Sequence, residues 1–453
     1  MVLQRVFKGY PRRWINNHLR QQLIGLGASS SNGSSSCQNE PFSFTLLTYN
    51  ILAQSLFNRH EGFSYCSKES ARWSVRRENL YSELKEYNAD IVCLQECDKY
   101  DDFWKEHLEG MGYATFYNPQ YNPTKGFKPM PYGLLFAVKS DKFQVLESEV
   151  VLMEQELLSD ASISDMSELE REEIKHSGNI AQIFVLKSTE FAEEGLILTN
   201  SHLFWRPECN YVRLRQLMLM IARTLEVYKK YPDYAILSCG DFNTTPASFP
   251  YKLLTLPGRV LTEDFSTNIR GDLVHHNMDF GNMSRENVDR YFRNVNFCEQ
   301  RIIEEFKSTC GNMELKVDDY LEMEKDKRAK SITALVSFFV KNYPSFISMY
   351  SFFGNLNPED HSTMKIHDKW EHGEVYYTMY TPEFKSTLDY IFMWHLDESK
   401  LELSKLLSIP LPEELNEQEA LPNDRHSSDH ISLMVELVST RKLDNKNTKP
   451  SNC

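Results

Sequence analysis

The chain has 453 residues, a net charge of −14, 41% hydrophobic residues and 25% charged residues. This composition is typical of a globular protein with a buried core, and no run of about 18 apolar residues predicts a transmembrane helix. The acidic balance argues against a protein that coats nucleic acid, but it does not exclude a nuclease, since a metal ion and a few local cations can serve phosphates. Nine cysteines without CxxC pairs favour reduced thiols in an intracellular protein.

The first 40 residues differ from the rest of the chain. Up to residue 39 they contain five basic residues and no acidic residue, mixed with apolar side chains and followed by a serine-rich run. This pattern resembles a mitochondrial or chloroplast transit peptide, and a disordered tail is the alternative. We therefore expect a mitochondrial protein, with the chloroplast, cytoplasm and nucleus as alternatives.

Strand-like and helix-like segments follow one another from residue 41. The predicted strands are residues 42–52, 90–96, 132–139, 181–187, 195–205 and 234–243, and the predicted helices are 74–89, 101–113 and 210–231. Several strands follow each other without a helix between them. This order predicts a layered α/β domain with mixed sheets over residues 41–438.

Two segments interrupt this pattern. Residues 154–176 are acidic and polar and predict a loop with a mobile helix. Residues 258–375 predict a helical insertion, with helices at 286–306 and 331–350, which could carry substrate or partner contacts or be decoration. The polar end of the chain, residues 439–453, predicts a disordered tail, and nothing in the sequence indicates a protein partner.

Polar side chains recur where apolar runs end or begin. Five of them close predicted strands and three stand at the start of apolar runs: Asn50, Glu96, His202, Asp241 and Asn243, then Asp389, Asp429 and His430. Each alone has an ordinary explanation, such as a turn cap, a surface ion pair or a structural histidine. Because strands of layered α/β proteins place reactive groups beyond their carboxyl ends, the repeated pattern predicts one shared site.

The residue types indicate metal-assisted chemistry on a phosphoester. Oxygen ligands without thiolates favour Mg²⁺, with Mn²⁺ possible. Glu96, assisted by Asn50 and Asp429, suits the metal.

The other residues suit the reaction itself. Asp241 suits a general base that orients water, with Asn243 holding either the base or the phosphate. His202 and His430 suit donors that stabilise developing negative charge.

Six ordered motifs connect these residues to a known family: "TYNILAQ", "DIVCLQE", "NSHLFWRPE", "GDFNTTP", "LDYIF" and "SDH". The chain resembles the endonuclease/exonuclease/phosphatase superfamily over about residues 42–438. The resemblance implies a four-layered α/β sandwich, two mixed β-sheets flanked by helices, here with a helical insertion. The phrases "HLFWRPE", "YTPEFKSTLDYIF" and "LPNDRHSSDH" are similar to those of carbon-catabolite-repressor-type deadenylases, nocturnin, Angel proteins and Ngl-type RNA exonucleases.

The resemblance also implies a role for each residue of the predicted site. Asn50 and Glu96 would place the metal, and His202 would contact the scissile phosphate. The remaining roles are water activation by Asp241 with support from Asn243, completion of the polar site by Asp389 and Asp429, and transition-state stabilisation by His430.

On the substrate side, the resemblance implies that Pro207 and Phe384 pack on a nucleobase. For Phe384, ordinary core packing is the alternative. Arg206, Arg213 and Arg215 could contact phosphates, although arginines at the start of a helix are also unremarkable.

These observations predict a Mg²⁺-dependent 3′–5′ exoribonuclease that acts on single-stranded RNA 3′ ends and releases 5′-mononucleotides, with poly(A) among its candidate substrates. Two alternatives remain open. One is a small-molecule phosphatase, such as an NADPH 2′-phosphatase similar to nocturnin. The other is a catalytically silent RNA-binding adaptor.

Overall fold

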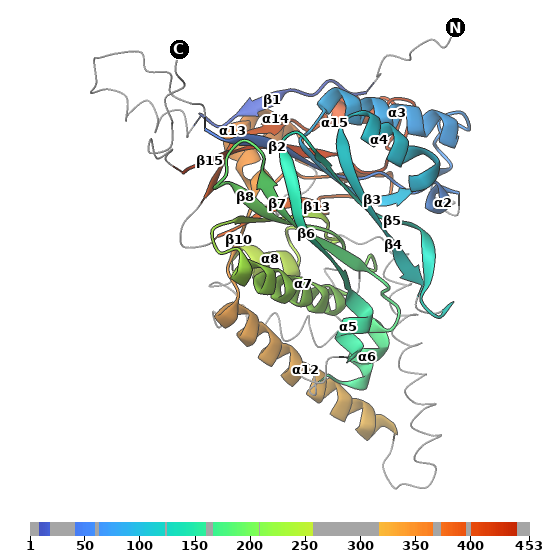
Figure 1. The fold of residues 1–453 in the computed structure, drawn as a ribbon. Helices are drawn as coiled ribbons and strands as arrows, with labels where there is room; N and C mark the ends of the chain where they lie inside the picture. The colour runs from blue at the N-terminus through green and yellow to red at the C-terminus, as the bar shows by residue number, and fades with distance from the viewer. Residues whose placement is uncertain are drawn as a thin grey trace, which may run out of the picture.

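Two β-sheets pack face to face between two layers of helices (Figure 1). The computed structural model describes residues 9–18, 41–58, 63–122, 125–159, 166–207, 209–256, 317–365, 373–395 and 400–441. In these residues the first sheet has seven strands and the second has six. The predicted fold, two mixed sheets flanked by helices, is confirmed.

The first sheet has a parallel strand pair at its centre. Its strand order is β1 (Trp14–Asn16), β14 (Leu401–Leu407), β15 (Leu433–Ser439), β2 (Ser43–Asn50), β3 (Ile91–Asp98), β5 (Lys128–Lys139) and β4 (Tyr113–Asn122). Only β2 and β3 run parallel among these described strands. The carboxyl ends of β2 and β3 therefore meet at one edge of the sheet.

The second sheet repeats this design. Its strand order is β10 (Phe346–Ser348), β13 (Asp389–Trp394), β9 (Ala235–Asp241), β8 (Gly195–His202), β7 (Ile180–Ser188) and β6 (Phe143–Leu152). Strands β8 and β9 are parallel, and each of their residues is buried. Burial on both faces explains the apolar runs at residues 196–198 of β8 and 235–237 of β9. A short hairpin pairs β11 (Met379–Tyr380) with β12 (Lys385–Ser386).

Helices cover the outer face of each sheet (Figure 1). The first sheet is covered by α3 (Trp73–Tyr87), a π-helical turn (Tyr100–Trp104) and α4 (Lys105–Gly110). The second is covered by α5 (Met153–Ser159), α6 (Glu168–Ile174), α7 (Asn210–Lys230), α8 (Phe249–Thr255) and α12 (Val317–Asn342). Shorter helical segments are α2 (Gln54–Phe57), a 3₁₀ turn (Met349–Phe352), α13 (Phe353–Leu356), α14 (Pro358–Thr363) and α15 (Pro412–Asn416).

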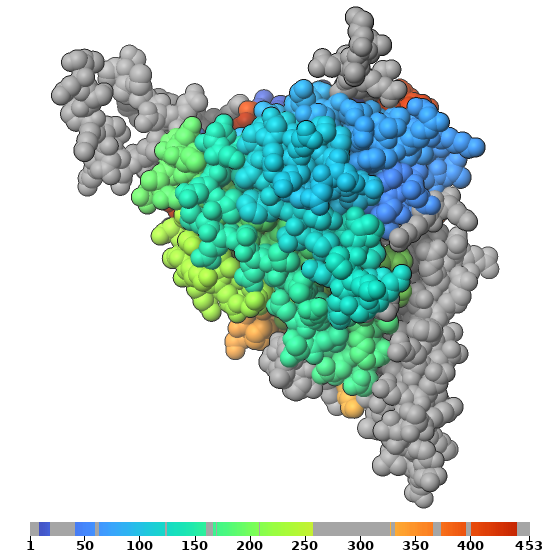
Figure 2. Space-filling view, turned by 45° about the vertical axis from the view of Figure 1, so that its right-hand side comes forward, coloured from blue at the N-terminus to red at the C-terminus, as the bar shows by residue number. Residues whose placement is uncertain are grey.

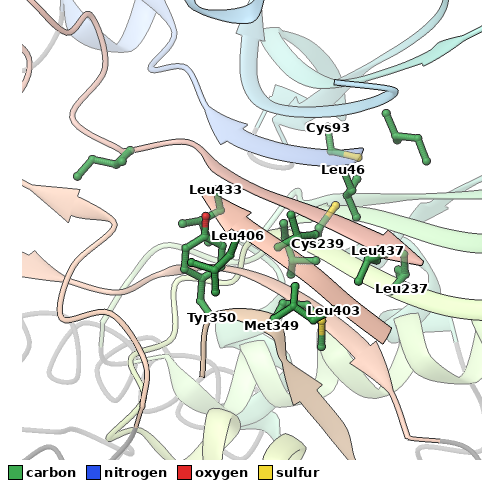
Figure 3. Close-up of a cluster of buried hydrophobic side chains, with 14 of the residues drawn as sticks. Leu46, Cys93, Leu237, Cys239, Met349, Tyr350, Leu403, Leu406, Leu433 and Leu437 are labelled. Carbon is green, nitrogen blue, oxygen red and sulfur yellow. The ribbon is translucent and has the colours of Figure 1, made fainter. Parts of the chain in front are cut away.

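The main hydrophobic core lies between the two sheets (Figure 3). Leu46 and Cys93 come from the first sheet, and Leu237 and Cys239 come from the second. Apolar side chains of both inner faces interdigitate here, as in other sheet-on-sheet packings. In a space-filling view, the blue and cyan first part of the chain adjoins the green middle part over a broad area (Figure 2). The core therefore holds the ends of the two parallel strand pairs in a fixed relationship.

The structure corrects the predicted start of the domain. Residues 10–17 lie inside the segment that the sequence analysis assigned to an extension, yet β1 pairs with β14 as the edge of the first sheet. Ile15 is buried, and its neighbours Trp14 and Asn16 are exposed. The alternation of exposed and buried residues spans only three positions, and the surrounding cationic residues are not typical of a strand. Residues 1–8 and 19–40 lie outside the described residues.

The predicted insertions are also corrected. Residues 154–176 contain α5 and α6, and α5 packs Met153 and Leu157 into the core beside α7. The helix predicted at 331–350 ends at Asn342, and β10 follows it. Apolar side chains of residues 349–364 pack in the core between the sheets, namely Met349, Tyr350, Phe353, Leu356 and Met364. The predicted insertion therefore extends too far. The helix at 286–306 and the tail beyond residue 441 lie outside the described residues.

None of the helices in the described ranges combines the length and apolar character needed to cross a bilayer.

Candidate active site

Strand register places three predicted site residues in one row across the second sheet. His202 pairs with Asp241 across the parallel strands β8 and β9, and Asp389 pairs with Asp241 across the antiparallel strands β9 and β13. Neighbouring strands lie about 4.8 Å apart, so side chains in such a row are close neighbours. His202 Nε2 lies 3.6 Å from Asp241 Oδ2. The three polar residues that the sequence placed at strand ends are therefore brought together.

The first sheet supplies the residues that face this row. Asn50 ends β2, and its Nδ2 donates one hydrogen bond to Glu96 Oε1 at 3.1 Å and another to Asp241 Oδ2 at 3.0 Å. One amide thus joins a carboxylate of each sheet. We call Asn50, Glu96, His202, Asp241, Asn243, Asp389, Asp429 and His430 the strand-end cluster.

A β-bulge sets the position of Glu96. The register between β3 and β5 shifts between Leu94 and Cys97, and Glu96 has a φ of 54°. Left-handed backbone is uncommon for residues other than glycine, and bulges next to active sites re-aim side chains. Ala53 N donates to Glu96 Oε2 at 3.1 Å and holds the carboxylate in the new direction.

Gly240 allows the close approach of β9 to β8. Its φ is 138°, and a Cβ at this position would lie 1.9 Å from the carbonyl oxygen of Ser201. Only glycine avoids that collision and adopts this backbone readily. The "GD" dipeptide therefore serves the pairing that puts Asp241 beside His202.

Asn243 supports Asp241 through its backbone. Asn243 N donates to Asp241 Oδ1 at 2.9 Å, while its side-chain Nδ2 donates to the carbonyl oxygen of Leu203 at 2.9 Å. Its φ of 47° is a conformation that asparagine tolerates better than most residues. The side chain thus ties the loop after β8 to the loop after β9, and support of the base comes from the main chain.

His430 is held by Asp389, and no sequence pattern favours Asp389 over the adjacent Asp429 for this contact. His430 Nδ1 donates to Asp389 Oδ2 at 2.7 Å, and His430 Nε2 lies 3.8 Å from Asp241 Oδ2. Thr378 Oγ1 donates to the same Asp389 oxygen at 2.6 Å. These bonds leave Nε2 of His430 facing Asp241.

Ser428 connects the "SDH" loop to the first sheet. Its Oγ donates to the carbonyl oxygen of Asn50 at 2.7 Å and accepts from the backbone N–H of His430 at 3.1 Å. This contact places Asp429 and His430 next to the end of β2.

Burial and neighbouring charges shift the pKa values of the cluster. Burial raises the pKa of Asp241, and the carboxylate of Asp389 raises it further. The pKa of Asp429 is raised to about 6, mainly by burial. His430 opposes this rise, and the nearby Glu96 adds to it. Burial lowers the pKa of His430, but the surrounding carboxylates, Asp389 first, outweigh burial and raise it well above the ordinary value. The cluster therefore combines a cationic imidazole with carboxylates that repel one another.

The donor set fits a divalent cation. Asp241, Asp389 and His430 can present ligand atoms within 4.8 Å of one another, and Asp389 Oδ1 is buried without a hydrogen-bond partner. We favour Glu96 over His430 as a ligand, since Asp389 already engages one ring nitrogen of His430. Glu96 is half-buried, and its repulsion with Asp429 is what a cation would relieve. Carboxylate and amide oxygens without thiolates suit Mg²⁺ or Mn²⁺.

The residues predicted to contact substrate lie in two loops next to the cluster. Arg206 and Pro207 follow β8, where Pro207 is exposed and Arg206 is half-buried. Phe384 is half-buried in the turn between β11 and β12, where its backbone N–H donates to Thr381 Oγ1. Core packing therefore does not fully enclose Phe384.

Arg213 and Arg215 were candidate phosphate contacts, and the structure corrects this interpretation. Both are buried in α7. Arg213 donates to backbone carbonyls of the loop after β8, and Arg215 donates to Tyr211 Oη and Ser331 Oγ. Because these hydrogen bonds occupy both guanidinium groups, Arg213 and Arg215 stabilise the loop and the helix and are not available to phosphates.

Arg76 is a further residue whose role the sequence did not reveal. It is fully buried, and it donates to Gln54 Oε1 and to the backbone oxygens of Ile51, Leu52 and Ser427. Arg76 thus fastens the loop after Asn50 to the loop before Asp429. A buried charge close to Glu96 and Asp429 also offsets part of their negative potential.

A chain of buried amides lies between the sheets. Gln95 Nε2 donates to Asn200 Oδ1 at 2.8 Å, Asn200 Nδ2 donates to Gln182 Oε1 at 3.0 Å, and Gln182 Nε2 donates to Asn118 Oδ1 at 2.7 Å. Gln95 and Asn200 directly precede Glu96 and Ser201 in the motifs. Hydrogen-bonded amides between two sheets fix their relative position more specifically than apolar contacts do.

The family model described as "Endonuclease/Exonuclease/phosphatase family" matches residues 47–430, which include every member of the strand-end cluster. The chain belongs to this family. The resemblance inferred from the six motifs is confirmed. Hydrolytic nuclease and phosphatase chemistry is the common property of the family named by this match.

Two relatives are named for cleavage of phosphodiesters or of RNA. Mouse 2′,5′-phosphodiesterase 12 is 24% identical over 404 residues, which are 86% of this chain and 51% of that protein. A probable RNA exonuclease of Schizosaccharomyces pombe is 26% identical over 420 residues, covering 87% of this chain and 75% of the relative. The chain spans about half the length of the phosphodiesterase relatives that it matches.

A solved structure shows the same fold. The crystal structure of ANGEL2, described as a 2′,3′-cyclic phosphatase, superposes with a TM-score of 0.61 at 19% identity, covering 94% of this chain and 98% of that chain. At this identity the likeness supports the fold and not the substrate.

Proposed function

We propose that this protein is a Mg²⁺-dependent phosphodiesterase that removes nucleotides from the 3′ end of single-stranded RNA. The observation that carries the proposal is the contact of Asn50 with Glu96 of one sheet and Asp241 of the other. It joins an oxygen-rich metal site to a carboxylate flanked by two imidazoles. That arrangement suits in-line attack of water on a phosphodiester.

Each group has a distinct task in the proposed reaction. Asp241 accepts the proton of the attacking water, and its raised pKa strengthens it as a base at neutral pH. Asn50 and the backbone N–H of Asn243 hold the two carboxylate oxygens in place. His202 and His430 donate from Nε2 to the phosphate oxygens as negative charge develops. Asp389 keeps the His430 ring oriented and cationic.

Glu96, with Asn50 and Asp429 beside it, would hold the metal ion. A divalent metal bound there supplies Lewis-acid polarisation of the phosphate. Mn²⁺ satisfies the same oxygen ligands, and Mg²⁺ is the proposed ion because it binds through few carboxylates and retains waters for a phosphate.

RNA is the proposed substrate because the names of two relatives refer to RNA or to a phosphodiester. One is a probable RNA exonuclease and another is a 2′,5′-phosphodiesterase. A 3′ direction and 5′-mononucleotide products follow from the resemblance to exonucleases of this branch. Poly(A) is one candidate sequence among others.

The test uses the full-length protein and a short 5′-labelled single-stranded RNA ending in adenosines, in Mg²⁺ and in EDTA. Wild type is compared with Glu96→Gln, with Asp241→Asn, and with Asp233→Asn as an exposed control of the same chemistry. We expect a ladder that shortens from the 3′ end only in Mg²⁺, present for wild type and Asp233→Asn and absent for Asp241→Asn. Glu96→Gln should give no ladder at the lowest Mg²⁺ concentration that saturates wild type.

Two further substrates separate the alternatives. A 2′,5′-linked oligoadenylate tests the linkage, and NADPH with detection of inorganic phosphate tests a small-molecule phosphatase. RNA left intact in every lane together with phosphate release from NADPH would overturn the proposal in favour of the phosphatase. RNA binding without cleavage of any substrate would favour the silent adaptor.

A further inference from the structure

We infer that Trp205 forms a stacking platform for a nucleobase of the RNA strand, on a loop that is built rigidly beside the strand-end cluster. This inference rests on the proposed function and extends it to a specific substrate contact. Trp205 is 55% exposed, the highest value among the large hydrophobic side chains of the described residues. Its neighbour Phe204 is 3% exposed, so the loop turns one ring inward and the other outward.

The loop at residues 203–207 starts directly after His202. Three residues of extended chain span at most about 11 Å, so the Cα of Trp205 lies within that distance of the Cα of His202. His202 Nε2 is 3.6 Å from Asp241 Oδ2, within the strand-end cluster. The indole is thus close enough for a nucleotide at or next to the scissile phosphate.

A buried arginine of α7 holds this loop through hydrogen bonds to its backbone. Arg213 is 2% exposed, and its Nη1 donates to the carbonyl oxygens of Phe204 at 2.9 Å and Arg206 at 2.5 Å. Its Nη2 donates to the carbonyl oxygen of Pro207 at 2.7 Å. One guanidinium therefore fixes three carbonyls on both sides of Trp205.

Further hydrogen bonds tie the loop to the active site. Asn179 Nδ2 donates to the carbonyl oxygen of His202 at 2.8 Å, and Asn179 Oδ1 accepts from Gln216 Nε2 at 3.0 Å. Gln216 Oε1 accepts from the backbone N–H of Phe204 at 2.9 Å. Asn243 Nδ2 donates to the carbonyl oxygen of Leu203. A loop ordered before binding loses little further entropy when a ligand docks, which is the advantage of a preorganised contact.

Charge next to the indole matches an RNA ligand. The Arg206 guanidinium lies 5.7 Å from the Trp205 ring centroid and 5.8 Å from that of Phe204. The chain has a net charge of −14, and Arg206 supplies positive charge beside the exposed ring. Stacked bases with nearby arginines are the usual means of binding single strands without sequence preference.

The test measures RNA binding by fluorescence anisotropy in an Asp241→Asn background of the full-length protein with Mg²⁺. Trp205→Ala should weaken binding of a short labelled RNA by roughly 5- to 150-fold, the range found when a stacking aromatic is replaced by alanine. Trp205→Phe should retain most of the affinity. Phe338→Ala is the control, since Phe338 is 52% exposed on α12 and belongs to the helical layer outside the second sheet.

A second RNA that lacks bases at its 3′-terminal positions identifies the contact. It should bind the Trp205→Ala and parent proteins equally, because the base is absent in both cases. An equal loss of affinity for normal and abasic RNA in Trp205→Ala overturns the inference. Unchanged affinity of Trp205→Ala for normal RNA also overturns it, and would favour a protein partner for the exposed indole.

Failure of the inference is distinguishable from failure of the proposed function. If wild type and the single variant Trp205→Ala bind and cleave RNA equally well, only the stacking platform is disproved. Protein that cleaves no RNA, but whose base-dependent RNA binding is lost in Trp205→Ala, disproves the nuclease and keeps the platform.

Discussion

Asp389 Oδ2 lies 2.7 Å from His430 Nδ1, although the two residues are separated by 41 positions in the sequence. Because a carboxylate only accepts hydrogen bonds, this contact fixes which ring nitrogen carries a proton on the Asp389 side. The other nitrogen then faces Asp241. The pair is a carboxylate that orients a histidine, an arrangement found in unrelated hydrolases.

Asp389→Asn is expected to lower kcat by roughly 10²–10⁴-fold with little change in KM, because the uncharged amide no longer holds the imidazole cationic and aligned. Steady-state cleavage of labelled RNA measures both constants. Asp101→Asn, an exposed position, is the matched control. Full kcat in Asp389→Asn would show that His430 acts without this partner.

Glu96→Gln is expected to raise the Mg²⁺ concentration for half-maximal activity by at least about 10–100-fold, a range known even for lost outer-shell partners of metal sites. Loss of one negative charge elsewhere should have no such effect. Glu86→Gln on the exposed face of α3 tests this point. Identical Mg²⁺ titrations of the two variants would remove Glu96 from the metal site.

Arg76→Lys is expected to lower the free energy of unfolding by roughly 2–4 kcal/mol, since one ammonium cannot reach all four acceptors and leaves buried carbonyls without donors. Urea unfolding measures the change. Arg77→Lys, one residue along the same helix and only half-buried, should stay within about 0.5 kcal/mol of wild type. Equal stability of the two variants would contradict the proposed clamp.

Glu374 makes a specific contribution to the pH dependence of stability. Burial raises the pKa of Glu374 to about 7 from an ordinary value of 4.5, and Tyr251 Oη donates to its Oε1 at 2.6 Å. Between these two pH values the folded protein keeps a proton that the unfolded chain has lost. The free energy of unfolding therefore falls as the pH rises through this window.

Glu374→Gln removes that titration and should be more stable than wild type by up to roughly 3 kcal/mol above pH 7, with the difference vanishing near pH 4.5. Urea unfolding at several pH values measures it. Glu359→Gln, at an exposed position of α14, is the control. A stability difference that does not change with pH would contradict this account.

Arg12→Ala tests the contribution of the N-terminal strand. Arg12 donates to the carbonyl oxygens of Ser408 and Ser432 and to Ser432 Oγ, each within 2.7 Å. Its loss should cost roughly 1–3 kcal/mol of unfolding free energy. Arg13→Ala removes an exposed ion pair with Asp360 and should cost less than about 1 kcal/mol. Equal costs in urea unfolding would show that the strand adds no specific stability.

The sequence predicts the fold, and it selects polar residues that the structure brings together, because both depend on where apolar runs end. Asn50, His202 and Asp241 each close a buried strand, and this pattern is visible without coordinates. Glu96 closes the apolar run of β3, although the strand continues past it to Asp98. Parallel pairing at the centre of each sheet then brings the strand ends together.

Residues that act on backbone groups could not be predicted in this way. Arg76 and Arg213 resemble ordinary helix charges because a carbonyl acceptor has no sequence signal of its own. Ser428 contacts Asn50 across 378 positions of the sequence. The choice of Asp389 over Asp429 as partner of His430 depends on strand register, which composition does not encode.

The position of β1 limits how a leader could be removed from this chain. We propose, from its N-terminal composition, that the protein is imported into mitochondria. A peptidase that cut after residue 17 would strip the edge from the first sheet and leave the main-chain N–H and C=O groups of β14 open to strands of other molecules. A cut before Tyr10 would preserve that edge and keep β14 covered.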